Sequence, residues 1–498
     1  MRRLALVVIA AWPVASQAQV SGYLPIDDPR LPYIENLINA GVIRDPSPFI
    51  RPFRRVDLMR VLDAADTTNP AVAKARAQLR DAFLEPVADA TWGAEVRGGL
   101  QAFTQARVDP LHPDGIGATR PYLEADLQAT AGPVVLVSRP DIEPRLILDP
   151  DWTGRKDLTV TGRMIEAYIS AQWKPARLFY GQMAQHWGPQ GLTSLTLGNY
   201  SYPRPEFGLD FYFGPFHLGS EAAQLQDETD TLGLIVHRYF FAHRLDLRAS
   251  KRVQLALFES NVLSGYDQNF DARYSNPVSL LLLANEYGQG DNANIEVGLD
   301  ASWQAARWLT LQGEGVLDDF QYKSNDSGYT YPNRFAFTLA AFGPISHWIT
   351  WRLTYSLVSS LAFRATDKYD NFVDAGVGIG RNYGGNDQLT LTAGIPLPSL
   401  ILLTPELTYL RQGEGSLASP APPVGAISTA TPTVFVGVIE STARAALTVS
   451  GAWRWARFAG SAGYQHVSNQ DHVTGQSDNQ FVGRLFLTVG WGRRGSFK

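Results

Sequence analysis

From Trp92 to the carboxyl end, apolar and polar residues alternate along the chain. In residues 349–357, ITWRLTYSL, every odd position is apolar and every even position is polar. Because successive side chains of a strand point to opposite faces, such a segment has one apolar face and one polar face. The same alternation recurs in segments that begin near Phe335, Leu389 and Phe481. The pattern predicts a long series of antiparallel strands.

A soluble β-sandwich would also alternate, but three features favour a membrane barrel. The pattern continues for about 400 residues without a helical interruption, and its polar positions carry Arg, Thr, Ser, Gln and Asp, as a lumen would. Short turns at 174–175 and 305–306 alternate with long Gly-, Asn-, Asp- and Pro-rich loops at 323–333 and 413–432. Transmembrane barrels have short periplasmic turns and long external loops, and an even number of strands. We therefore expect an all-β transmembrane barrel of about eighteen antiparallel strands.

Aromatic residues gather near the predicted strand ends, where an interfacial girdle of a barrel would lie. Examples are Trp303, Trp308, Trp348 and Trp351. The mean hydropathy is slightly negative, −0.13. No apolar run of eighteen residues follows the amino-terminal segment, which excludes a helical membrane protein. A barrel is compatible with this composition, because half of each strand faces a polar lumen.

Before the strands, from Pro29 to Asp89, the period is helical and predicts a small α-helical region. An apolar stripe ends at Gly41, a second helix begins near Val56, and a third covers 71–83. The segment LPYIENLINAGVI…RPFRRVDLMRVL resembles a single S-layer-homology repeat. The resemblance implies a cell-wall polymer such as peptidoglycan as a partner. We favour a periplasmic cap or plug of the barrel, and cell-wall binding is the alternative.

The amino terminus predicts export. Arg2 and Arg3 precede the apolar run 4–11, and Ser16-Gln17-Ala18 supplies the small residues of a cleavage site. We assign 1–18 to a signal peptide, 19–90 to the helical periplasmic region and 91–498 to the barrel, in the cell outer membrane.

Charge and motifs exclude several other classes of function. Loss of Arg2 and Arg3 would change the net charge from −5 to −7, which argues against a nucleic-acid partner. The chain has no cysteine, so it has no disulfides and no thiolate metal site. Gly376-x-Gly378-x-Gly380 lies in what we interpret as a strand, so it is no dinucleotide fingerprint. No histidine pair has a metal-binding spacing on a helix. We expect no cofactor and no metal.

The most distinctive segment runs from Gly181 to Leu209 and contains His-Trp-Gly-Pro followed by Pro-x-Pro. It resembles the Wzi-type capsule-assembly family, whose members carry Gly…Trp-Gly-Pro…Leu…Asn…Pro-x-Pro in the first half of an outer-membrane barrel. This chain has Trp-Gly-Pro-Gln-Gly where that family more often has glycine directly after proline. The resemblance implies a signal peptide, a small helical periplasmic portion and a role in retaining capsular polysaccharide at the cell surface.

Trp187-Gly188-Pro189 cannot continue a central ladder, since proline lacks a donor and glycine weakens a strand. We therefore expect residues 186–206 to leave the barrel wall, either into the lumen or onto a rim. Its aromatic rings and donors would suit sugars, and a plug loop is the alternative. The candidate residues for glycan binding or for a lumen plug are His186, Trp187, Gly188, Pro189, Asn199, Tyr200, Tyr202, Pro203, Arg204 and Pro205.

A second motif opens an enzymatic alternative. His466 and Ser468 are two residues apart, so both project from the same face of a strand. The spacing resembles the His-x-Ser of outer-membrane phospholipases and lipid A deacylases, in which histidine activates serine for acyl transfer. The pair would have to face the lipid. Neighbouring small residues leave its facing open.

These observations favour a non-catalytic outer-membrane barrel for capsule or exopolysaccharide assembly or retention. Its partners would be surface polysaccharide and outer-membrane lipid. A porin is the first alternative, distinguished by whether residues 181–210 obstruct the lumen. A lipid deacylase that uses His466 and Ser468 is the second.

Overall fold

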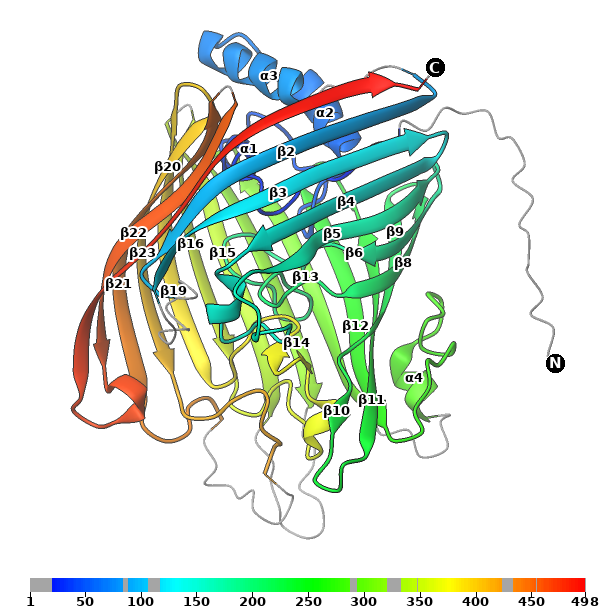
Figure 1. Ribbon diagram of the computed structural model, residues 1–498, viewed down its shortest axis with the longest axis vertical. Helices are drawn as coiled ribbons and strands as arrows, with labels where there is room; N and C mark the ends of the chain where they lie inside the picture. The colour runs from blue at the N-terminus through cyan, green and yellow to red at the C-terminus, as the bar shows by residue number, and fades with distance from the viewer. Residues whose placement is uncertain are drawn as a thin grey trace, which may run out of the picture.

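The computed structural model describes residues 20–83, 88–105, 117–286, 293–319, 333–346, 348–422, 433–453 and 455–497. The predicted signal peptide, 1–18, and most of the loop at 323–333 lie outside these residues. Within them, one antiparallel sheet closes on itself, because β2 pairs with both β3 and β23 (Figure 1). The sheet has nineteen strands, of which β10 (Glu228–Thr229) is a two-residue addition to β11. The remaining eighteen form the wall, which confirms the predicted fold class.

The strands of the wall follow one another around the barrel in chain order. They are β2 (Ala90–Phe103), β3 (Ala118–Ala131), β4 (Val134–Glu143), β5 (Thr161–Gln172), β6 (Ala176–Gln182), β8 (Pro205–Phe213), β9 (Phe216–Gln224), β11 (Ile235–Leu247), β12 (Val253–Gly265), β13 (Asn294–Ala306), β14 (Leu309–Asp319), β15 (Arg334–Ser346), β16 (Ile349–Val358), β19 (Asn386–Leu397), β20 (Ile401–Gln412), β21 (Glu440–Trp453), β22 (Ala456–Ser468) and β23 (Ser477–Ser496).

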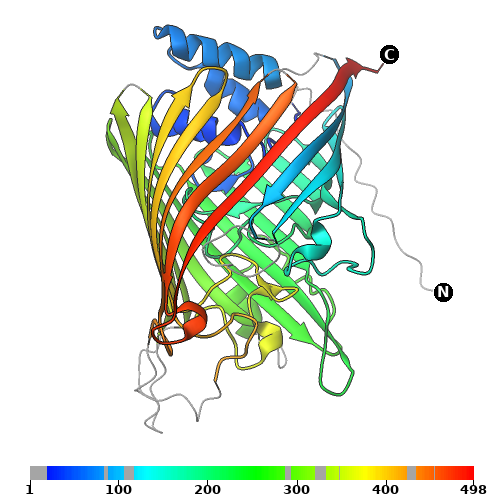
Figure 2. The ribbon, with the colours of Figure 1, turned by 60° about the vertical axis from the view of Figure 1, so that its left-hand side comes forward.

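The two ends of the barrel differ. At one end the strands are joined by short turns, such as 132–133 and 307–308, and at the other by long loops, such as 359–385 and 413–439. In Figure 2 the amino-terminal helices lie at the end with the short turns. The turn expected at 305–306 is wrong by two residues, because β13 continues through a bulge to Ala306.

The outer surface of the wall is apolar, whereas the inner side chains are buried and many of them are polar. Exposed aromatic residues gather near the short turns, as a membrane-interface girdle requires. They are Trp173, Phe213, Phe216, Trp303, Trp308, Trp453, Trp455 and Trp491. On the inner side, Glu124 Oε1 lies 2.7 Å from Arg97 Nη1 and 2.9 Å from Arg139 Nη2. Buried charges are retained where they are paired in this way. Among the described residues, no helix is both long and apolar enough to cross a membrane.

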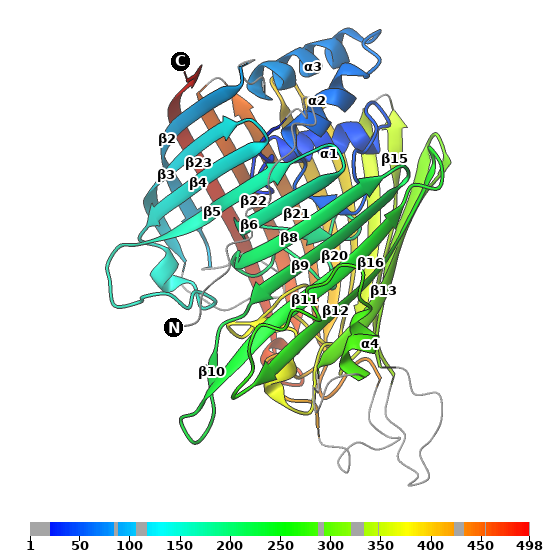
Figure 3. The ribbon, with the colours of Figure 1, turned by 90° about the vertical axis from the view of Figure 1, so that its right-hand side faces the viewer.

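Three helices precede the wall: α1 (Leu31–Asn39), α2 (Arg55–Asp63) and α3 (Pro70–Phe83). α1 is amphipathic, and Gly41, with φ +69°, ends its apolar stripe as the sequence predicts. The helices share an apolar core with Leu400, in the turn between β19 and β20, and with Leu402 of β20. Asn36 donates to the backbone oxygen of Trp348 at 2.8 Å. Figure 3 shows these helices at the mouth of the barrel, and we call residues 20–63 the plug.

The long loops carry short elements of their own. They are β7 (His186–Trp187), β17 (Val373–Asp374), β18 (Val377–Gly378), α4 (Leu281–Glu286) and the 3-10 turns η1 (Leu146–Leu148), η2 (Lys368–Asp370) and η4 (Gln470–His472). β17 pairs with β18, so the glycines at 376–380 lie in a loop hairpin. Our interpretation of that segment as a wall strand is wrong. Four or five alternating residues do not distinguish a loop hairpin from a wall strand.

Candidate functional site

Between β6 and β8 the chain leaves the wall and enters the lumen. We call residues 183–204 the insertion. Its strand β7 pairs with β1 (Ile50–Arg51) of the plug, with Ile50 opposite Trp187. The backbone N–H of Gly188 donates to the oxygen of Phe49 at 2.7 Å. The plug, which enters from the short-turn end, and the insertion, which enters from the long-loop end, therefore meet in the barrel interior.

Glu314, on the inner side of β14, anchors the insertion. Its carboxylate accepts the Ser194 hydroxyl at 3.0 Å and the Leu195 N–H at 3.2 Å. Gly188 lies against the same carboxylate with φ +110°, and a Cβ there would be 2.7 Å from Glu314 Oε2. Only glycine combines this backbone conformation with this close approach. The glycine of the Trp-Gly-Pro motif is thus required by its close approach to Glu314.

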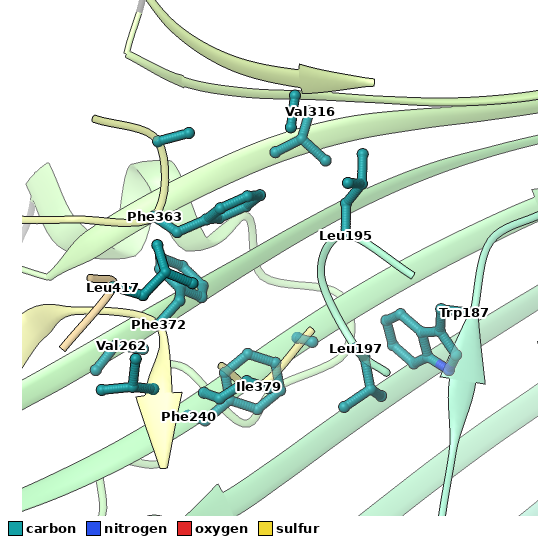
Figure 4. Close-up of a cluster of buried hydrophobic side chains, with 14 of the residues drawn as sticks. Trp187, Leu195, Leu197, Phe240, Val262, Val316, Phe363, Phe372, Ile379 and Leu417 are labelled. Atoms are coloured by element: carbon teal, nitrogen blue, oxygen red, sulfur yellow. The ribbon is translucent and has the colours of Figure 1, made fainter. Parts of the chain in front are cut away.

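An apolar cluster fills the lumen beyond Gly188. The insertion contributes Trp187, Leu195 and Leu197, and the loops 359–385 and 413–439 contribute further side chains (Figure 4). We call this set the lumen cluster, and its larger members are Trp187, Leu195, Leu197, Leu225, Phe240, Phe258, Val262, Val316, Val358, Phe363, Phe372, Val373, Ile379 and Leu417. The N–H of Gly198 donates to the oxygen of Ile379 at 3.1 Å, which joins two loops directly. The described loops therefore pack inside the barrel like the core of a soluble domain.

The ten candidate residues divide by burial. Six are buried in the barrel: His186, Trp187, Gly188, Pro189, Tyr200 and Arg204. Tyr202 and Pro203 are half-buried, and Asn199 and Pro205 are exposed. Pro205 is the first residue of β8 and pairs with Gln182, so the departure from the wall ends at 204, two residues before the expected 206. This proline lies at a strand start, where a missing donor is tolerated.

His186 is neutral in this site. Its Nε2 lies 3.1 Å from the backbone oxygen of Pro189, and burial lowers the pKa of the ring to about 4. Burial disfavours the charged imidazolium when no carboxylate compensates it. A neutral, buried histidine with a backbone partner supports the loop conformation.

Towards the long-loop end, the insertion meets the loop that follows β4. Tyr202 donates its hydroxyl to Asp149 at 2.9 Å, and the Trp152 ring stands edge-on to Tyr202 with centroids 5.2 Å apart. The Arg163 guanidinium lies 4.9 Å from the Tyr202 ring centroid. We call Asp149, Trp152, Arg163 and Tyr202 the rim cluster. Of these four residues only Tyr202 is predicted from the sequence, since the other three are about forty to fifty residues away and share no motif with it.

The structure shows which face of the wall carries His466 and Ser468, the motif of the enzymatic alternative. Along β22, Gln465 and Val467 point inward and are buried, whereas Tyr464 and His466 point outward and are exposed. His466 and Ser468 therefore both lie on the outer face of the wall.

Within the described ranges, no group of three or more His, Asp or Glu residues could hold a metal ion.

No protein-family model and no curated protein sequence matches the chain. By structure, it is similar to Wzi of Escherichia coli, an outer membrane protein involved in Group 1 capsule assembly and a carbohydrate-binding β-barrel. The TM-score is 0.63 at 15% identity, covering 96% of this chain and 100% of the other. OprD of Pseudomonas aeruginosa matches at a TM-score of 0.44 and 10% identity, covering 82% of this chain and 94% of OprD. OccAB4 of Acinetobacter baumannii matches at a TM-score of 0.43 and 8% identity, covering 82% of this chain and 99% of OccAB4. The chain therefore shares the fold of the Wzi-type outer-membrane barrel, as the Trp-Gly-Pro and Pro-x-Pro residues predict.

Proposed function

We propose that this chain is a closed outer-membrane barrel that retains or organises a surface polysaccharide at its long-loop end, without breaking a bond in it. The observation that carries the proposal is the filled lumen: the plug, the insertion and the lumen cluster occupy the path that a porin leaves open. The carbohydrate-binding description of Wzi, whose fold the chain shares, supports the choice of ligand. The short turns and the plug then face the periplasm, and the long loops face the cell exterior.

The plug interpretation of the amino-terminal helices is favoured over cell-wall binding. In the S-layer-like segment, the apolar side chains of Tyr33, Ile34 and Leu37 are buried in the core that the helices share with the wall. A residue buried in this core has no free surface for a polymer. Asp27, outside that core, lies 3.0 Å from Arg139 of the wall, which adds a charged contact between plug and barrel.

The rim cluster is the part of the insertion best suited to sugars. Trp152 and Tyr202 are half-buried and offer aromatic rings, which pack against the C–H faces of pyranose rings. Each contact would be weak, and a long polymer would gain affinity by repeating it on many barrels.

The test is retention of polysaccharide in a deletion strain complemented with variants. We expect the deletion to release polysaccharide into the medium and the wild type to restore retention. A Trp152→Ala, Tyr202→Ala double variant should fail to restore it, while Trp308→Ala, an exposed tryptophan near a short turn at the other end, should restore it. Retention that is unchanged in the deletion strain would refute the polysaccharide role.

Conductance tests the closed lumen independently. Purified wild-type barrel in a planar bilayer should show no steady channel. A stable ohmic conductance of the wild type would contradict the closed barrel and make a porin the better description.

A further inference from the structure

Three polar side chains lie on the outer face of β22 and β23 at the ends near the long loops. His466 lies directly opposite Asn479 in the strand pairing, and His466 Nδ1 is 2.9 Å from Asn479 Oδ1. Ser468 is two residues further along β22, on the same face and next to the loop. Residues i and i+2 of a strand are about 7 Å apart at Cα, so a serine hydroxyl and a histidine ring at these positions are within reach of each other.

The hydrogen bond to Asn479 selects one tautomer of the neutral ring. An amide oxygen only accepts, so in the neutral ring that makes this bond Nδ1 carries the hydrogen and Nε2 keeps its lone pair. Nε2 is then the nitrogen available to take a proton from the serine. A nucleophile, a base and a third group that orients the base are the parts of a hydrolytic triad.

We propose that Ser468, His466 and Asn479 form an esterase site that hydrolyses carboxylic esters of outer-membrane lipids. The proposal goes beyond polysaccharide binding, which uses none of these residues, and departs from the expectation that the chain is no enzyme. Ser468 and His466 are the catalytic residues, and Asn479 is a positioning residue that acts through His466.

The surroundings suit a lipid ester. One step toward the membrane centre, Tyr464 and Phe481 face each other across the strands and are 56% and 63% exposed on the outer face. The adjacent outward position on β21 is Ala443, paired with His466, and leaves room beside the ring. An acyl chain that lies along this apolar wall would place its ester near the ends of the strands, at the level of Ser468.

The backbone after Ser468 turns through left-handed conformations. Asn469, Asp471 and His472 have φ of +52°, +54° and +60°, a region in which Asn, Asp and His are enriched among residues other than glycine. Side-chain bonds hold the conformation: Asp471 N–H donates to Glu440 at 2.7 Å, and Asn469 donates to the oxygen of Ile439 at 2.9 Å. These bonds fix the course of the chain directly after Ser468.

The reaction balances without a further reagent. The Ser468 hydroxyl oxygen attacks the ester carbonyl carbon while His466 Nε2 accepts the hydroxyl proton. The tetrahedral intermediate expels the lipid alkoxide, which takes that proton and leaves as an alcohol. Water then attacks the acyl-serine with His466 as base, and the carboxylic acid leaves with Ser468 restored.

The experiment measures fatty-acid release by the full-length barrel reconstituted in vesicles of phosphatidylethanolamine, in one arm, and of lipopolysaccharide in the other. We expect release in at least one arm, and the arm identifies the source of the ester. Ser468→Ala should lower the rate by about a thousandfold, within the range of a lost acid–base system. Ser461→Ala, on the same strand but facing the lumen, is the matched control and should retain the wild-type rate.

Asn479→Ala should lower kcat with little change in KM, whereas Asn479→Asp, which keeps the acceptor, should recover most of the rate. A long-chain sulfonyl fluoride should label Ser468 in the wild type and not in His466→Ala. Heat-dependent gel mobility of each variant verifies folding. No release from the folded wild type in either arm, or release that Ser468→Ala does not change, would overturn the proposal and leave polysaccharide retention untouched.

Discussion

Replacement of Trp187 by alanine should loosen the insertion and make the barrel conduct. Trp187 is 4% exposed and packs in the lumen cluster, and the Arg244 guanidinium lies 5.5 Å from its ring centroid. Removing a buried tryptophan side chain costs about 3–5 kcal/mol, because the cavity that remains relaxes only in part. The eighteen-stranded wall does not depend on this side chain, so the cost falls on the insertion. Since 1.4 kcal/mol is about tenfold, the released population should rise by roughly a hundredfold to a few thousandfold.

Two readouts separate release of the insertion from damage to the wall. Hydrogen exchange of the Gly188 and Gly198 amides should lose protection by about the same 3–5 kcal/mol, while amides of the wall strands stay protected. Planar-bilayer recordings should show openings absent from the wild type. Trp455→Ala, an exposed tryptophan at a short turn, is the control and should remain silent. If Trp187→Ala keeps wild-type exchange and stays silent, the insertion is not held by the lumen cluster and the reasoning fails.

Three further predictions concern the same insertion. Arg352→Met removes bonds that tie the plug and the insertion together, and should cost about 3 kcal/mol in detergent unfolding, whereas Arg411→Met, at a half-exposed site, should cost little. Because burial lowers the pKa of His186 to about 4, only the released state gains a proton as pH falls below 6.5. The stability of the insertion should therefore fall by up to about 3 kcal/mol between pH 6.5 and 4, and exchange measurements should find this slope missing in His186→Asn. Gly188→Ala, which brings a Cβ against Glu314, should destabilise the insertion by about 1–3 kcal/mol and increase exchange at the same amides.

The sequence predicts the wall well and the interior poorly. Alternation such as that of 349–357 is a local property of each strand, so it indicates both the strands and their number. Where both faces of a strand carry small residues, as around His466, the alternation does not predict which face points into the lumen. That assignment depends on pairing with β21 and β23, which is set by the closed barrel.

The candidate site was predictable only in part. Trp187-Gly188-Pro189 predicts a departure from the wall, because proline and glycine interrupt a ladder of strand hydrogen bonds. No local pattern predicts that Gly188 contacts Phe49 of the plug, or that Tyr202 donates a hydrogen bond to Asp149, since each contact joins segments far apart in the sequence. Motifs thus indicated where the chain leaves the sheet, and tertiary packing determined what it meets.

Because Trp187 and Ser468 lie on opposite sides of the wall, we expect substitutions at the two residues to act independently. Trp187 lies in the lumen and Ser468 on the outer surface, and within the described residues no ion pair or hydrogen bond joins the two. Effects of sites without shared partners add. The Trp187→Ala, Ser468→Ala double variant should therefore conduct like the first single variant and lack esterase activity like the second. A double variant that conducts less than Trp187→Ala alone would show that the outer site and the insertion are coupled through the wall. Additivity would instead establish one barrel with two separate chemistries, because a strand sends alternate side chains to two surfaces that never meet.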